Sequence, residues 1–324
     1  MKIIISTLIL LSILLLYSCT KEINLGLDGA PKRLVIEGNI YNTPGPYIIR
    51  LTLSNPALEN HTGQGGIDYV EAVKNATVII SDETGIIDTL QPSPDTLRRF
   101  AKFYRNRNKL DSFYRVDANY FNGERGFYQT TKIIGTSGRT YSLRVLYNNK
   151  EYNASAYMPT VPTLDSVKFK VRPGIKDNIT YKVPTLYFRE DINIDNYYWT
   201  FSDFSVNDRR TSAPIISSTR EILPFSIFDD RFLQPYVNGI YSDFTYARNA
   251  TQGDIIRHYG FVYLCSLTQQ HYNFLKLIID QVESDGGTYK PTPSSPLTNI
   301  SNNGLGYFGA SAISRVFVFD PDFY

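Results

Sequence analysis

The sequence predicts a mainly β protein in which an N-terminal immunoglobulin-like β-sandwich is followed by a second β-rich domain with one packed α-helix. Three observations lead to this fold class. Short segments of alternating apolar and polar residues recur from Arg33 onward. Turn-forming residues such as Asn148-Asn149 separate several of these segments. One segment, near residues 268–284, has the three-to-four-residue apolar spacing of a helix.

The composition is that of a globular chain without a dominant charge. Of the 324 residues, 42% are hydrophobic and 20% are charged, which is enough apolar material for one large domain or two average ones. Lys plus Arg total 33 against 31 for Asp plus Glu, and this near-balance argues against nucleic acid as a partner. Three His and two Cys supply few metal ligands, so we expect no metal site and no cofactor.

The N-terminus predicts a lipoprotein signal peptide over residues 1–18. A basic Met1-Lys2 start precedes the apolar run Ile3–Tyr17, which is shorter than the roughly 20 residues of a membrane-spanning helix. The run ends in Leu16-Tyr17-Ser18-Cys19, which resembles the bacterial lipobox. We therefore expect Cys19 to be the lipid attachment site: its thiol forms a thioether with a diacylglyceryl group, and its amine, once freed by cleavage, is acylated by a palmitate-like chain. The alternative is an ordinary signal peptide that happens to end at a cysteine.

Residues 19–32 then form a lipidated tether before the first strand. Acyl chains hold a protein at a membrane surface, so we expect an outer-membrane location. The charged pair Lys21-Glu22 just after the cysteine resembles the export signal of some surface lipoproteins of Bacteroidota. This pair favours the cell surface over the periplasmic face.

The first predicted domain covers residues 33–160 and consists of short strands. In Tyr47–Leu53, for example, Ile49 and Leu51 share one face while Arg50 and Thr52 share the other. Asn148-Asn149 supplies the two residues of a tight hairpin turn. Regular short strands separated by such turns are typical of an immunoglobulin-like sandwich. The predicted strands are Leu34–Glu37, Tyr47–Leu53, Asn75–Ser81, Arg139–Tyr147 and Lys150–Tyr157.

The second predicted domain covers residues 161–324. The stretch Met158–Leu164 contains two prolines and no periodicity, which indicates a boundary. The one helix of this second domain should start at a capping box with Ser266 as N-cap and Gln269 at N3, and it should stop at Gly286-Gly287. The predicted strands are Ser166–Val171, Thr185–Arg189, Tyr197–Phe204, Glu221–Phe228, Ile255–Leu264 and Ala312–Asp320.

Two motif matches lack the context that their chemistry requires. Gly304–Gly309 matches the dinucleotide fingerprint, but a polar turn precedes it and a strand follows, so we expect a Gly-rich crossing beside the final strand. Asp191–Asp195 has the oxygen spacing of a calcium loop, yet Asn196 and Ser202 replace the expected Gly and Glu. An acidic turn is favoured, with a calcium site of another kind as the alternative. Cys265, inside an apolar run, is expected to be a buried structural residue.

One strongly basic stretch stands out between Thr96 and Leu110. Phe100, Phe103 and Tyr104 interrupt it, and it contains no acidic residue. A solvated hairpin with a charged edge is favoured over a patch that binds an anionic ligand or an acidic partner. The candidate patch residues are Arg98, Arg99, Lys102, Arg105, Arg107 and Lys109.

We assign no catalytic residues. The G-x-S-x-G, P-loop and HExxH motifs are absent from the sequence, and the three His do not pair at zinc spacing. We therefore expect a protein that is not an enzyme. A glycan-active hydrolase with a carboxylate pair is the remaining alternative, since spacing along the chain does not show such a pair.

Several blocks of the sequence resemble the Bacteroidota outer-membrane lipoprotein family catalogued as domain of unknown function 4249. The resemblance runs from the lipobox to the C-terminus, although the stretch Arg98–Lys109 is longer and more cationic than the family pattern. It implies an accessory role beside a TonB-dependent outer-membrane transporter, and it brings no catalytic residues with it. The matching blocks are Leu34–Gly38, Gly45–Tyr47, Gly138–Leu143, Asn196–Trp199, Asp229–Phe232 and Asn302–Ala310.

The functional expectation is therefore an outer-membrane-anchored lipoprotein that acts as a non-enzymatic accessory or binding component, beside a TonB-dependent transporter. The alternative is an independent surface adhesin for glycan or matrix, with Arg98–Lys109 as its contact. The membrane, the transporter and a glycan are the expected partners.

Overall fold

The computed structural model describes residues 31–54, 71–94, 101–103, 113–115, 123–173, 179–207, 214–219, 227–241, 246–249, 257–283 and 295–319. The predictions for the signal peptide and Cys19 lie outside these ranges. The elements described belong to the unit made of Arg33–Ser54 and Tyr69–Tyr324.

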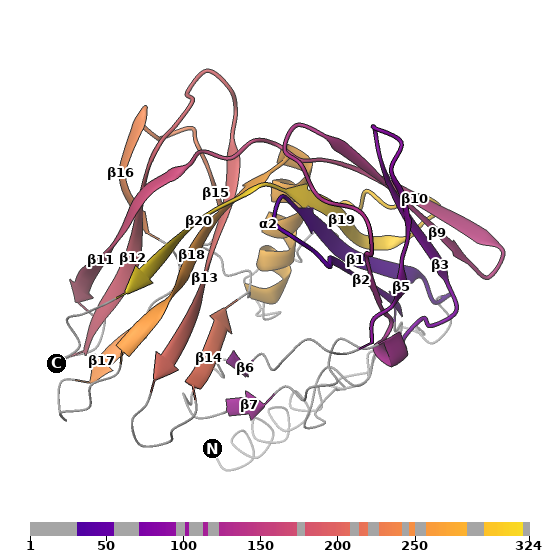
Figure 1. The fold of residues 1–324 in the computed structure, drawn as a ribbon, viewed down its shortest axis with the longest axis horizontal. Helices are drawn as coiled ribbons and strands as arrows, with labels where there is room; N and C mark the ends of the chain where they lie inside the picture. The colour runs from indigo at the N-terminus through magenta and orange to yellow at the C-terminus, as the bar shows by residue number, and fades with distance from the viewer. Residues whose placement is uncertain are drawn as a thin grey trace, which may run out of the picture. The chain divides into compact units, whose positions relative to one another are not determined.

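The first half of the fold contains two β-sheets that share one core (Figure 1). One sheet has the order β19-β1-β2-β8-β5 and the other has the order β10-β9-β3-β4. The short 3-10 helix η1, Gly123–Arg125, precedes β8. The strands of the first sheet are β1 Leu34–Tyr41, β2 Ile48–Leu53, β5 Gln91–Pro92, β8 Phe127–Gln129 and β19 Leu305–Ser311. Those of the second are β3 Thr77–Asp82, β4 Ile87–Thr89, β9 Thr140–Tyr147 and β10 Lys150–Tyr157.

The strand order of these sheets is that of an immunoglobulin-like sandwich. Strands β1-β2-β8-β5 follow the A-B-E-D order, and β10-β9-β3-β4 follow the G-F-C order with one added edge strand. Tyr141, at the start of β9, forms the corner typical of this fold: its hydroxyl accepts from the Thr136 N–H (2.6 Å) and donates to the Thr136 carbonyl (3.3 Å). The predicted mainly β fold with an immunoglobulin-like sandwich is confirmed.

Period-two patterning explains which side chains form the first core. Ile49 and Leu51 of β2, and Val78 and Ile80 of β3, are fully buried, as their alternation predicts. The hairpin between β9 and β10 turns at Asn148 and Asn149, whose φ angles of 47° and 58° lie in the left-handed region that Asn tolerates.

The C-terminal part of the chain contributes to the same sandwich. Strand β19, yellow in Figure 1, pairs in parallel with β1 from Val35↔Leu305 to Tyr41↔Ser311. The segment predicted as a Gly-rich crossing is therefore itself mostly a strand. Gly306 has a φ of 86°, and a Cβ there would lie 2.1 Å from the Ile36 carbonyl oxygen, so only glycine fits. The predicted division of the chain at residue 160 stays a prediction.

Two further sheets enclose a second core of buried side chains, including Leu186, Phe188, Tyr198 and Leu264. One has the order β11-β12-β16, with β17 also paired to β12, and the other has the order β20-β18-β13-β14-β6-β7, with β15 also paired to β13. The strands of the first are β11 Leu164–Pro173, β12 Ile179–Arg189, β16 Tyr236–Tyr241 and β17 Tyr246–Asn249. Those of the second are β6 Ala101–Phe103, β7 Phe113–Arg115, β13 Tyr197–Asn207, β14 Pro214–Thr219, β15 Ile227–Asp229, β18 Arg257–Leu267 and β20 Ile313–Phe319.

The helix α2, Gln269–Glu283, lies within the predicted range and packs on β13, β15, β18 and β19. Leu275 and Ile279 are buried in a cluster with Trp199 and Cys265. The predicted N-cap, Ser266, is wrong. Ser266 belongs to β18, where its hydroxyl donates to the Pro159 carbonyl (2.8 Å) and accepts from the Ala312 N–H (3.0 Å).

Thr268 caps α2 instead, because its hydroxyl accepts from the N–H of His271 (3.2 Å) and its carbonyl accepts from the N–H of Tyr272.

Within the described ranges, no helix has the length and apolar character needed to cross a membrane.

Candidate ligand-binding site

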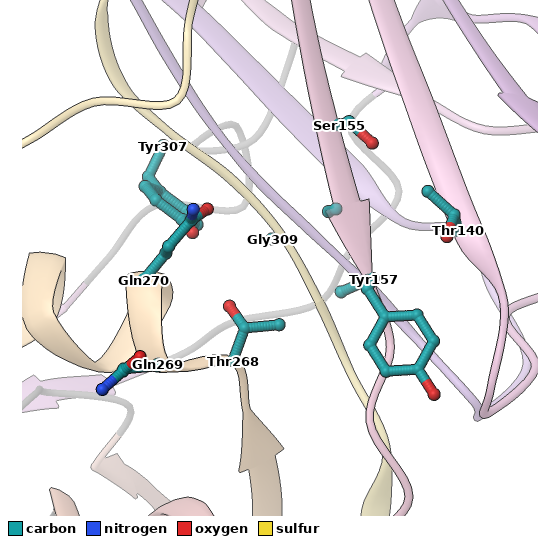
Figure 2. Close-up of a pocket in the computed structure, with 10 residues that line it drawn as sticks. Thr140, Ser155, Tyr157, Thr268, Gln269, Gln270, Tyr307 and Gly309 are labelled. Atoms are coloured by element: carbon teal, nitrogen blue, oxygen red, sulfur yellow. The ribbon is translucent and has the colours of Figure 1, made fainter.

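A cavity of about 390 Å³ lies among β9, β10, β19 and the start of α2. Figure 2 shows Gln270 and Tyr307 on one side of it and Thr140 and Tyr157 on the other, with the strand that carries Gly309 between them. Its volume falls in the range of about 300–1,000 Å³ that is typical of small-molecule sites. The lining residues are Thr140, Ser155, Ala156, Tyr157, Thr268, Gln269, Gln270, Tyr307, Gly309 and Ala310.

The lining is polar but uncharged. Of the lining residues that the structure describes, five carry a hydroxyl group and two carry a carboxamide, and none is Asp, Glu, Lys, Arg or His. Hydroxyls and carboxamides both donate and accept hydrogen bonds, so they match a ligand that presents both kinds of group. The cavity also contains two tyrosine rings, Tyr157 and Tyr307, which supply apolar faces.

The Tyr307 ring is held in place by the helix. The His271 ring stacks on it with a centroid distance of 4.6 Å, and the Phe274 ring lies 4.9 Å away. His271 and Phe274 are three residues apart on α2, so they face the same side. Burial raises the pKa of the Tyr307 hydroxyl, and a hydrogen bond with the Thr268 side chain partly offsets this. The ring is thus preorganised at the cavity wall.

Gly309 allows the backbone of β19 to approach the helix closely. A Cβ at this position would lie 2.2 Å from Asn39 Oδ1 and 2.5 Å from His271 Cε1. Two buried polar atoms next to it, Asn39 Oδ1 and His271 Nδ1, find no hydrogen-bond partner in the described part of the chain. The Asn39 amide nitrogen donates to Ser311 Oγ at 3.2 Å. Glycine at this point is therefore required by packing around the cavity.

Burial lowers the pKa of His271 to about 4, so this histidine is neutral at pH 7. In the unfolded chain, His271 takes up a proton near pH 6.5, whereas in the folded protein it does so only near pH 4. The free energy of unfolding should thus fall as the pH drops from about 6.5 to about 4, by about 3 kcal/mol in all. Urea unfolding across this range measures the loss.

The variant His271→Phe keeps an aromatic ring against Tyr307 but has no titrating group. The free energy of unfolding of wild type, taken relative to that of the variant, should fall by about 3 kcal/mol between pH 6.5 and pH 4, because only wild type loses stability through this histidine. A difference that does not change with pH would contradict the assignment.

Most residues of the predicted basic patch lie outside the described residues, and so does Cys19; these patch residues are Arg98, Arg99, Arg105, Arg107 and Lys109. Lys102 lies in β6, which pairs antiparallel with β7. Asp191–Asp195 is a turn between β12 and β13, as favoured, in which Asp191 accepts from the Asn193 N–H and side-chain amide. Cys265 is buried in β18, as expected.

Within the described ranges, no three His, Cys, Asp or Glu residues gather as a metal would require.

Sequence reasoning missed the cavity because four separate segments line it. The sequence assigns several of these residues to strands, to the helix cap or to the motif match Gly304–Gly309, but no pattern in it connects them as one site. The apolar spacing of α2 pointed to Leu275 and Ile279, which are buried, but the cavity residues Gln269 and Gln270 precede that pattern. No periodic pattern marks a polar cavity between a helix start and a strand edge.

Comparison with known proteins places the chain in one family. None of the curated proteins compared with the chain matches it. The family described as Domain of unknown function (DUF4249) matches residues 20–315, which is most of the chain. Because the match covers more than half of the chain, the protein belongs to the DUF4249 family.

Proposed function

We propose that the protein is a non-enzymatic binding component of the outer membrane, anchored through Cys19 and working beside a TonB-dependent transporter. In this role the cavity holds a small, neutral, hydroxyl-rich ligand of the saccharide class at the membrane surface. The observation that carries the ligand class is the lining: among the residues that the structure describes, it has seven hydrogen-bonding side chains and no charged one.

The chemistry of the lining favours a neutral polar ligand over the other classes. A charged ligand would lose its hydration without gaining a counter-ion from the wall. A wholly apolar ligand would displace water from the Thr140 hydroxyl without replacing the hydrogen bonds that the water made. A saccharide satisfies these groups with its own hydroxyls and places its apolar ring face against Tyr157 or Tyr307.

The same lining supports binding rather than turnover. General acid–base catalysis needs a group whose pKa lies near the working pH. The ionisable side chains of the lining are the two tyrosines, and burial moves the pKa of Tyr307 further above neutrality. The Tyr307 hydroxyl therefore stays protonated at neutral pH, and both tyrosines act as hydrogen-bonding and stacking groups.

Tyr157→Ala tests the ligand class directly. Tyr157 is partly exposed on β10, so its removal should leave the fold intact while it removes an aromatic face from the cavity. By titration calorimetry with a panel of neutral and anionic oligosaccharides, wild type should bind a neutral member. The variant should bind it at least about tenfold more weakly, a loss of about 1.4 kcal/mol.

The matched control is Tyr236→Ala, which removes a similarly exposed tyrosine from another sheet. This variant should bind as wild type does. Binding that is confined to anionic sugars, or equal binding by wild type and Tyr157→Ala, would overturn the proposed ligand class.

A further inference from the structure

Two loops at one end of the second pair of sheets carry exposed apolar side chains. Residues 190–196 connect β12 to β13, and residues 230–235 connect β15 to β16. Ile192, Ile194 and Phe232 are 57%, 52% and 88% exposed; we name these three the loop-tip cluster. Several large apolar side chains exposed on adjoining loops are typical of interaction surfaces.

Backbone contacts fix the two loops to each other. The Asn196 N–H donates to Asp230 Oδ2 (2.7 Å), and the Asp230 N–H donates to the Asn196 carbonyl (3.1 Å). The Glu190 N–H donates to the Pro235 carbonyl (3.0 Å). Ile192, Ile194 and Phe232 are therefore presented from one hydrogen-bonded unit rather than from two independent loops.

A buried carboxylate, that of Glu190, stabilises the loop of residues 190–196 through hydrogen bonds. Glu190 is only 7% exposed, and both of its oxygens lie 2.9 Å from the Tyr198 hydroxyl, which donates to them. The Asn196 side-chain amide donates to Glu190 Oε1 (2.7 Å) and also reaches the carbonyls of Asp191 and Ile194. Burial raises the pKa of Glu190, and the Tyr198 and Asn196 hydrogen bonds oppose that rise. Such a network lowers the entropy cost of binding because the loop is already ordered.

The surroundings of the loop-tip cluster are acidic. Residues 189–196 and 229–236 contain five carboxylates and two arginines. Arg231 is held by Asp229 through contacts of 2.9 and 2.7 Å, and Arg189 lies over the Tyr236 ring at 5.9 Å. Asp191 and Asp195 are exposed and Asp230 is half-buried. The other two carboxylates are already engaged, since Glu190 is buried and Asp229 pairs with Arg231.

We propose that the loop-tip cluster is a docking surface for a protein partner whose apolar groove is bordered by Lys and Arg side chains. Exposed Ile and Phe gain most from an apolar groove, and the acidic surroundings select a basic border by charge complementarity. The same carboxylates disfavour insertion into an anionic membrane surface. This surface is separate from the cavity, so it does not depend on the saccharide proposal.

Site-specific photo-crosslinking on the full lipidated chain in cell envelopes tests the docking surface. A photoreactive residue replaces Ile192 or Phe232 in turn, and the control places it at Ile87, which is 61% exposed on β4. The first two positions should link to one and the same protein, and position 87 should not. The yield should fall severalfold between about 0.05 and about 0.5 M NaCl, and Asp191→Asn with Asp195→Asn should lower it further, because charge complementarity is screened by salt.

A second variant separates the docking surface from folding and from the cavity. With the photoreactive residue at position 192, Phe232→Asp should reduce the crosslink at least about tenfold, whereas Ile87→Asp should not change it. Both variants should keep the saccharide affinity and unfolding midpoint of wild type. A crosslink to lipid only, to a second copy of the chain, to a protein irrespective of salt, or to nothing would overturn this inference while leaving the saccharide proposal standing.

Discussion

Replacing Cys19 with alanine is expected to move the protein from the outer-membrane fraction to the soluble fraction. The proposed anchor consists of acyl chains on this residue, and each buried CH₂ group contributes about 0.8 kcal/mol to membrane binding. Without its thiol the chain has no site for the thioether, so the whole anchoring free energy is lost. Fractionation followed by a carbonate wash measures the change.

The matched control is Cys265→Ala, the other cysteine of the chain. Cys265 is buried in β18, so its removal should leave the protein in the membrane fraction. If Cys19→Ala still remains with the outer membrane after the wash, the anchor proposal is wrong.

Replacing Asp88 with alanine is expected to lower the free energy of unfolding by about 3–6 kcal/mol, since each buried donor left without a partner costs about 1–3 kcal/mol. Asp88 is fully buried on β4. Its carboxylate accepts the backbone N–H groups of Thr131 (2.7 Å), Lys132 (2.7 Å) and Ile133 (3.0 Å), and also the Thr131 hydroxyl (2.7 Å). Alanine would leave all four donors without this acceptor.

Urea unfolding of the unlipidated protein at pH 7 checks the Asp88 prediction. Burial by itself would raise the pKa of Asp88, but these four donors lower it further than burial raises it. The stabilisation is therefore complete above the ordinary pKa of about 4 and is lost as the pH falls through the lower, folded-state value. Asp165→Ala, at an exposed carboxylate, serves as the control and should cost less than about 0.5 kcal/mol. Equal costs for the two variants would contradict the role of Asp88.

The parts of the fold that were predicted are those in which side-chain alternation decides burial. Tyr141, Leu143 and Val145 alternate in the sequence and are buried on one face of β9, and Asn148-Asn149 turns the hairpin as expected. Pairing between distant segments leaves no such local pattern. The parallel pairing of β19 with β1, some 270 residues apart, depends on the close approach of Gly306 to Ile36. The sequence shows the glycine but does not indicate which residue it packs against.

The start of the helix shows how tertiary contacts override a local motif. Ser266 and Gln269 have the spacing of a capping box, but the Ser266 hydroxyl is engaged by Pro159 and Ala312. The cap therefore moves to Thr268, which also lines the cavity. Neither the contact with Pro159 nor the one with Ala312 is visible from residues near the helix.

The candidate sites differ in how far the sequence points to them. The sequence predicts an acidic turn at Asp191–Asp195. It does not predict that Ile192 and Ile194 are exposed there, because isoleucines between two strands can equally belong to a core; their exposure is a consequence of the fold. No pattern in the sequence predicts that Glu190 is buried. It becomes a supporting residue only because Tyr198 and Asn196 meet it where the strands end.

Affinity purification of the tagged, lipidated protein in mild detergent, followed by mass spectrometry, is the most direct test of the proposed role. We expect a TonB-dependent transporter to co-purify in stoichiometric amount, and an unrelated tagged lipoprotein not to retain it. A protein that purifies alone would contradict the accessory role. It would favour the independent adhesin, with Arg98–Lys109 as the stretch to neutralise next.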